Sequence, residues 1–158
     1  MSADDRGAMS FATPTDFEVV VTRFVEAPAE HVFDAWTQPE QVAQWMLGPT
    51  GYTMPVCEID LRPGGVWHFV WRGPGGRTLE MNGEYREIVR PERIVSIERW
   101  GDPWPDTFNV FEFDEDDDGT TITCTVVYPS KTARDAAIET GMREGMADSF
   151  DRLAEHLG

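Results

Sequence analysis

The chain has few basic side chains. Its 158 residues contain 13 Lys and Arg against 29 Asp and Glu, which gives a formal net charge of -16 at pH 7. Nucleic acids and anionic membranes are bound through clusters of Lys and Arg, so the sequence predicts no nucleic-acid partner. The excess of carboxylates favours solubility, and by itself it indicates no function.

Long apolar segments are also missing. No apolar run approaches the length of about 20 residues that is needed to span a bilayer, so no membrane insertion is expected. The segment 1–15 carries Asp4, Asp5 and Arg6 but no apolar stretch of the kind found in signal peptides. We therefore predict a flexible tail over residues 1–15, a single domain over residues 16–158 and a cytoplasmic location.

Motifs for metal, cofactor or nucleophilic chemistry are absent. The two cysteines, Cys57 and Cys124, belong to no C-x-x-C spacing, and the chain has no H-x-x-x-H pair and no Gly-rich phosphate loop. The acidic run at 114–119 lacks the closing glutamate of a calcium loop, which favours a solvated turn. We therefore predict no metal, no cofactor and no catalytic residue; the sequence leaves enzyme activity undecided and favours a non-catalytic role.

The stretch Lys131–Leu157 has the pattern of one long amphipathic helix. Its apolar stripe covers about a third of the circumference and consists of Ile138, Met142, Met146, Ser149, Phe150, Leu153 and Leu157. Such a helix would be about 40 Å long and would need a sheet to lie across. Gly141 and Gly145 each cost about 1 kcal/mol relative to Ala inside a helix, which indicates either close packing on the short helices or a pocket mouth.

The rest of the chain is predicted to supply that sheet. Phe17–Val25 predicts a first strand, and Pro28 and Pro39 each suit the first turn of a short helix. From Tyr52 onward, strands alternate with turn residues as in an antiparallel meander. The six strands expected there are Thr53–Asp60, Val66–Trp71, Thr78–Ile88, Arg93–Trp100, Thr107–Phe113 and Thr121–Tyr128. This order predicts an α+β domain with a curved sheet around the last helix.

Several segments, taken in order, carry a family resemblance. They are Ala27–Trp36 with Pro39, then Trp45, Glu58–Trp67, Gly83–Ile88 with Pro91–Ile94, and Gly141–Met146 ahead of Leu153. In these segments the chain resembles the family of domains similar to the carboxy-terminal domain of the activator of the Hsp90 ATPase, within the Bet v 1-like, START-related (SRPBCC) superfamily. The resemblance covers nearly everything from Phe17 to Leu157.

The resemblance implies the helix-grip fold. In that fold a curved seven-stranded antiparallel sheet wraps around the last helix, with two short helices after the first strand and a cavity between sheet and helix. The family commonly places Trp after the second glycine of the last helix, where this chain has Met146. A thinner, flexible side chain there is expected to widen or reshape the cavity.

Strand periodicity indicates which residues line the cavity. Alternation puts Trp67, Phe69 and Trp71 on one face of their strand and Met81 and Tyr85 on one face of the next. The predicted ligand-binding residues are Trp45, Trp67, Phe69, Trp71, Met81, Tyr85, Trp100, Met142, Met146 and Phe150. A filled core is the alternative, because a dozen such side chains at about 1.5–3 kcal/mol each would hold the helix without a ligand.

In the strands near 93–100 and 107–113 the sequence does not decide which residues face inward, because both faces carry bulky side chains. His68 is expected on the solvent face of its strand, opposite its aromatic neighbours. Three strand glutamates are Glu80, Glu98 and Glu112. Any one turned inward is expected to need a partner such as Arg99 or Arg62.

Three functions are compatible with these observations. The leading hypothesis is a non-catalytic protein that binds a small apolar molecule in the internal cavity. The first alternative is an enzyme of the cyclase or hydrolase type, with Tyr85, His68 or an inward glutamate assisting proton transfer. The second is a chaperone-interacting module, as the family name suggests. The sequence leaves open a homodimer and does not identify the ligand.

Overall fold

The structure, a computed structural model, describes residues 8–158 as one antiparallel sheet with helices on one face. The strands are β1 (Ser10–Ala12), β2 (Glu18–Val25), β3 (Thr53–Ile59), β4 (Val66–Arg72), β5 (Thr78–Val89), β6 (Arg93–Arg99), β7 (Thr107–Glu115) and β8 (Thr120–Val127). The helices are α1 (Ala29–Thr37), α2 (Pro39–Trp45), α3 (Lys131–Glu139) and α4 (Met142–Leu157), with a 3-10 turn, η2 (Pro74–Gly76), between β4 and β5.

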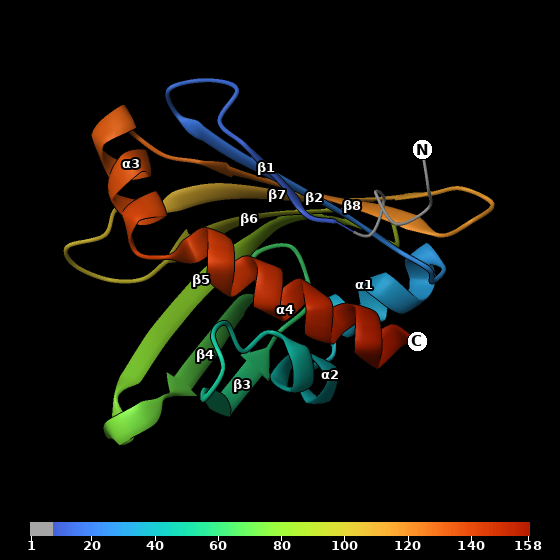
Figure 1. Ribbon diagram of the computed structural model, residues 1–158, viewed down its shortest axis with the longest axis horizontal. Helices are drawn as coiled ribbons and strands as arrows, with labels where there is room; N and C mark the ends of the chain where they lie inside the picture. The colour runs from blue at the N-terminus through green and yellow to red at the C-terminus, as the bar shows by residue number, and fades with distance from the viewer. Residues whose placement is uncertain (1–7) are drawn as a thin grey trace.

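The strand order is β1-β2-β8-β7-β6-β5-β4-β3, so the meander from β3 to β8 ends beside β2. Every neighbouring pair is antiparallel. The sheet bends around α4, while α1 and α2 lie beside the C-terminal half of that helix (Figure 1). We call the sheet face toward α4 the concave face; its side chains include Val21, Trp67, Met81, Ile94 and Ile122. This arrangement is the helix-grip fold, and the predicted fold class is confirmed.

The sheet has one strand more than the seven expected. The additional strand is β1, which pairs with β2 through Phe11 opposite Val21 and lies inside the segment predicted to be a tail. The ring of Phe11 faces the guanidinium of Arg143 on α4 at 5.5 Å. These contacts attach residues 10–12 to the sheet and to α4. The rest of the tail prediction, for residues 1–7, lies outside the described residues.

The prediction of a single helix over Lys131–Leu157 is wrong. The chain forms α3, whose N-terminus is capped by the Ser130 hydroxyl accepting from the Ala133 amide at 3.1 Å, and then turns before α4. Gly141 makes the turn at φ 89°, a left-handed conformation that glycine adopts without steric cost. Since the hydrophobic stripe continues across the break, periodicity alone did not reveal it.

Replacement of Gly141 by alanine is expected to destabilise the fold by about 1–2 kcal/mol, because an L side chain is strained at this φ. The matched control is Gly145→Ala. Gly145 lies inside α4, and a Cβ there would be 3.5 Å from Cδ of Pro49, an ordinary contact. The control is therefore expected to be neutral or stabilising by up to about 1 kcal/mol. Urea unfolding of both variants checks the difference, and equal stabilities would contradict it.

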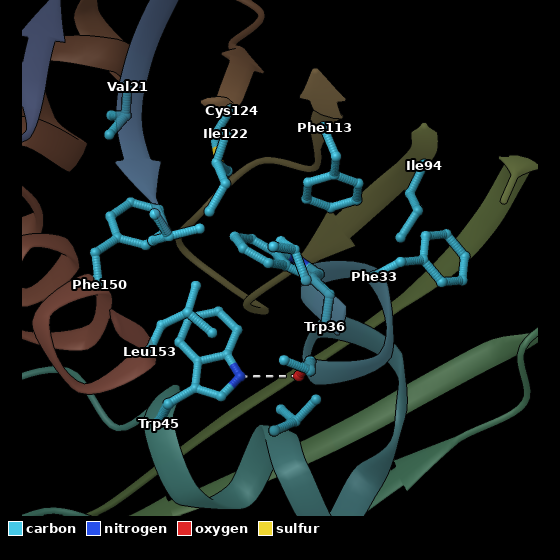
Figure 2. Packing of buried hydrophobic residues seen from close by; sticks show 14 of the residues in the cluster. Val21, Phe33, Trp36, Trp45, Ile94, Phe113, Ile122, Cys124, Phe150 and Leu153 are labelled. Carbon is cyan, nitrogen blue, oxygen red and sulfur yellow. Dashed lines mark hydrogen bonds between the residues drawn. The ribbon is translucent and has the colours of Figure 1, made fainter. Parts of the chain in front are cut away.

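One half of the space between the sheet and α4 is a packed core. Trp36 of α1 lies 4.8 Å from Trp45 of α2 and 6.0 Å from Phe150 of α4, measured between ring centroids (Figure 2). Nε1 of Trp45 donates to the Ala35 carbonyl oxygen at 2.8 Å, and Leu153 is 0% exposed. Complete burial of such side chains stabilises the protein by about 1.5–3 kcal/mol each. This half of the interior is filled without a ligand.

Candidate functional site

The other half of the concave face carries polar side chains among its apolar ones. The strand register places Glu98 of β6 opposite Gly83 of β5 and Thr107 of β7. One pair further along, Ser96 lies opposite Asn109, and each of these two is 1% exposed. Buried polar groups oppose folding unless they are hydrogen bonded. Packing alone therefore does not account for this polar part of the wall.

Glu98 is the carboxylic acid of this group. Its Oε1 accepts a hydrogen bond from Nε1 of Trp100 at 2.7 Å. The residue keeps some accessible surface, yet burial of its carboxyl group raises the pKa of Glu98, and the Trp100 hydrogen bond opposes the rise only in part. Glu98 therefore holds its proton to higher pH than an exposed glutamate does, and the protonated acid is a hydrogen-bond donor.

The expected pairing of an inward glutamate with Arg99 or Arg62 is wrong. Arg99 follows Glu98 directly and so lies on the opposite face of β6, where its Nε is 3.3 Å from Oδ2 of Asp106. Nε of Arg62 is instead 2.9 Å from Oδ2 of Asp60. Within residues 8–158, no basic side chain forms an ion pair with Glu98.

An edge of the Trp67 ring lies over Gly83, the residue that pairs with Glu98. A Cβ built on Gly83 would be 2.3 Å from Cζ2 and Cη2 of the Trp67 ring, so the indole occupies the space that a side chain would take. The ring also lies 5.0 Å from that of Tyr85. Its buried Nε1 has no hydrogen-bond partner, whereas Nε1 of Trp71 donates to the Met46 carbonyl at 2.8 Å. Trp67 thus presents an unused donor on the concave face.

The hydroxyl groups nearby are also distinctive. The buried Oγ of Ser96 has no hydrogen-bond partner. Burial raises the pKa of Tyr85 above its usual range and that of Tyr128 to about 12, so both phenols stay protonated. The Tyr128 hydroxyl donates to Sδ of Met142 at 3.7 Å, which joins β8 to the start of α4. Hydrogen-bond donors therefore gather on this half of the concave face.

Several inward side chains in this half are half-buried rather than buried. They are Cys57 and Ile59 of β3, Leu79 of β5, and Met142 and Met146 of α4. The main packing partners of α4 are α2, α1, α3 and β2, and strands β4 to β6 are not among them. Helix α4 therefore covers β4 to β6 less completely than it covers the packed core.

Known proteins were compared with the chain by sequence and by structure. The sequence profile described as activator of Hsp90 ATPase homolog 1-like protein matches residues 26–158. The chain belongs to this family. No curated protein matches it in sequence. Membership confirms the resemblance drawn from the sequence motifs, and it places the helix-grip fold of this chain within the Bet v 1-like superfamily.

Solved structures of bacterial proteins share the fold. A protein from Rhodobacter sphaeroides is 24% identical, with a TM-score of 0.88 over 95% of this chain and 97% of that one. A protein from Mycobacterium smegmatis is 23% identical, with a TM-score of 0.85 over 94% and 96%. An AHSA1-like protein from Aeromonas hydrophila is 17% identical, with a TM-score of 0.74 over 89% and 95%. At these identities the likeness establishes the fold alone.

The structure divides the ten predicted ligand-binding residues of this family member into groups. The concave face carries Trp67, Phe69, Trp71, Met81 and Tyr85, and α4 carries the half-buried Met142 and Met146. Trp45 and Phe150 belong to the packed core, with ring centroids 6.3 Å apart. Trp100 is 40% exposed and stacks on Trp71 at 5.4 Å, at the end of the polar part of the wall.

Sequence reasoning did not identify Ser96, Thr107, Asn109 or Tyr128, and it left the direction of Glu98 open. Ser96 and Glu98 alternate with outward residues of β6, but bulky side chains on both faces of β6 and β7 obscured the register. The signal was the pair of polar residues two positions apart, Ser96 and Glu98. It becomes informative once Ile94, which is 1% exposed, is known to face inward.

The outward expectation for His68 is confirmed. Its ring lies on the convex face between Glu58 and Glu80, and the hydrogen bond with Glu80 raises its pKa. The side chain of His68 therefore does not line the interior.

A separate open hollow of about 490 Å³ lies beside Pro91 and the start of α1, lined by acidic side chains that include Glu92 and Glu112. It contains none of the predicted site residues. No helix among the described residues has the length and apolar character needed to cross a bilayer.

Proposed function

We propose that this protein binds a small, largely apolar molecule between the concave face and the N-terminal half of α4. The observation that carries the proposal is the contrast between the two halves of the interior. Around Trp45, Phe150 and Leu153 the side chains are almost fully buried, whereas Leu79 of β5 and Met142 and Met146 of α4 stay half-buried. Accessible apolar walls with a few polar groups are typical of small-molecule sites.

The aromatic side chains suit an apolar ligand. Trp67 lies 5.0 Å from Tyr85 and 6.3 Å from Phe69, and Phe69 lies 5.9 Å from Trp71. These rings form a continuous apolar surface along β4 and β5. Contact with such a surface removes apolar area of the ligand from water, which is worth about 25 cal/mol per Å².

Titration with a panel of lipophilic aromatic and aliphatic compounds tests the proposal. Tryptophan fluorescence is expected to change on binding, because Trp67 and Trp71 line the wall. Native mass spectrometry then gives the stoichiometry, which is expected to be one ligand per chain. Failure of the whole panel, together with an experimental structure in which side chains fill this half of the interior, would contradict the proposal.

Replacement of Met146 by tryptophan is expected to weaken binding at least about tenfold, because the larger ring takes up space beside the half-buried wall. The fold should persist, since the family commonly carries Trp at this place. The matched control is Met146→Leu, a volume-conserving change expected to cost less than about 1.5 kcal/mol and to leave binding nearly unchanged. Calorimetric titration of both variants checks this, and wild-type affinity in Met146→Trp would place the ligand elsewhere.

A second candidate is proton-transfer catalysis of the cyclase or hydrolase type at the same site. The buried acid Glu98 favours it, because a general acid works best when its pKa is raised toward neutral pH. Tyr85 is the other inward titratable candidate, and His68 is removed by its outward position. Turnover of a bound ligand that is lost in Glu98→Gln, with binding retained, would support catalysis; undiminished turnover in that variant would exclude this mechanism.

A further inference from the structure

Two buried donors on the concave face lack partners, and they lie around the same aromatic ring. Trp67 is 5% exposed and Ser96 is 1% exposed, and neither Nε1 of the first nor Oγ of the second has a hydrogen-bond partner within residues 8–158. Tyr85 connects them, since its ring lies 5.0 Å from that of Trp67 and its residue pairs with Ser96 in the register of β5 and β6. A buried donor without a partner destabilises the folded protein, so a ligand that accepts from it is favoured.

A third donor lies in the adjoining row. Glu98 pairs with Gly83, and the ring edge of Trp67 lies directly over that glycine. The atom Cζ2 at this edge is bonded to the carbon that carries Nε1, so the unused indole nitrogen is two bonds from an atom that lies over Gly83. Burial raises the pKa of Glu98, and in its protonated form the carboxyl group adds an O–H donor.

We propose that the ligand is a neutral, largely apolar molecule with a carbonyl or hydroxyl oxygen, which accepts hydrogen bonds from Trp67 Nε1 and the Ser96 hydroxyl. This inference rests on the proposed ligand-binding function and specifies the polar group of the ligand. An indole N–H only donates, so a cationic head would leave it unpaired. The formal net charge of -16 disfavours an anionic head such as a carboxylate.

The test compares naphthalenes that differ only in the head group. Acetylnaphthalene carries a ketone, isopropenylnaphthalene replaces the ketone oxygen by a CH₂ group of similar shape, naphthylethylamine is a cation, and naphthoate is an anion. Calorimetric titration of the full chain is expected to rank the ketone about tenfold tighter than the isopropenyl compound, with both charged compounds weaker. Higher affinity for the amine or for naphthoate would overturn the proposal.

Variants of Trp67 and Ser96 test whether these two donors cause the preference for the ketone. Trp67→Phe and Ser96→Ala remove one donor each, so each is expected to reduce the ratio of the ketone affinity to the isopropenyl affinity at least about threefold, whatever the smaller ring of Trp67→Phe does to the affinity for both compounds. As pH rises through the pKa of Glu98, wild-type affinity for the ketone is expected to fall, and Glu98→Gln is expected to abolish that dependence. Circular dichroism confirms that each variant is folded.

The outcomes separate the two proposals. If neither the ketone nor the isopropenyl compound binds, the proposed binding function itself is contradicted. If both bind equally and the preference is unchanged in Trp67→Phe and Ser96→Ala, the ligand site stands and the oxygen-bearing head is overturned.

Discussion

Replacement of Trp36 by alanine is expected to lower the free energy of unfolding by about 3–5 kcal/mol, as large aromatic truncations in cores do. Trp36 is the centre of the packed core. Its ring centroid lies 4.8 Å from that of Trp45, 5.4 Å from Phe111, 5.3 Å from Phe113 and 6.0 Å from Phe150. Truncation would therefore open a hollow against α2, α4 and β7 at once, and few of these neighbours are free to close it.

The matched control for this change is Trp104→Ala. Trp104 is 37% exposed in the turn between β6 and β7, where a surface substitution typically changes stability by less than about 0.5 kcal/mol. Equilibrium urea unfolding of the two variants gives the comparison. A loss below about 1 kcal/mol for Trp36→Ala would show that this half of the interior is not the main source of stability.

Replacement of Gly83 by alanine is expected to cost about 1–3 kcal/mol and to disturb the ligand site. The new Cβ would meet the carbonyl oxygen of Ile97 and the ring of Trp67, each at 2.3 Å. The carbonyl belongs to the backbone of β6 and cannot rotate away, so the strand must shift. The indole must also leave the wall, which moves its N–H. Ligand affinity is therefore expected to fall together with stability.

The control for Gly83→Ala is again Gly145→Ala, which adds the same methyl group where the nearest atom is 3.5 Å away. Thermal unfolding and ketone titration are measured on both variants. Unchanged stability and affinity in Gly83→Ala would mean that the position of the Trp67 ring over Gly83 is not required, and the site described around it would be wrong.

The sequence was sufficient for the fold because turns and alternation are local signals. The predicted strands agree with β2 to β8 to within a few residues, and the inward direction of Trp67, Phe69 and Trp71 followed from alternation alone. The break at Gly141 was missed because a glycine in a continuing apolar stripe is compatible with a helix as well as with a turn.

The polar part of the site was not predictable to the same degree. The register of β5 and β6 shifts between Tyr85 and Glu87, so Tyr85 and Ile88 both face inward although three positions separate them. Such a bulge has no signature in the sequence. Glu98 could therefore be named as a candidate but not oriented, and the unpaired state of Trp67 Nε1 became visible only in three dimensions.

Methyl NMR tests the central claim most directly, namely that one half of the interior is packed and the other binds an apolar molecule. The protein is labelled at Ile, Leu and Met methyl groups and titrated with acetylnaphthalene. The account predicts that the resonances of Met142, Met146 and Met81 shift in a saturable manner while those of Ile122 and Leu153 in the packed core stay in place. Shifts confined to the packed core, or no shift at saturation, would contradict it.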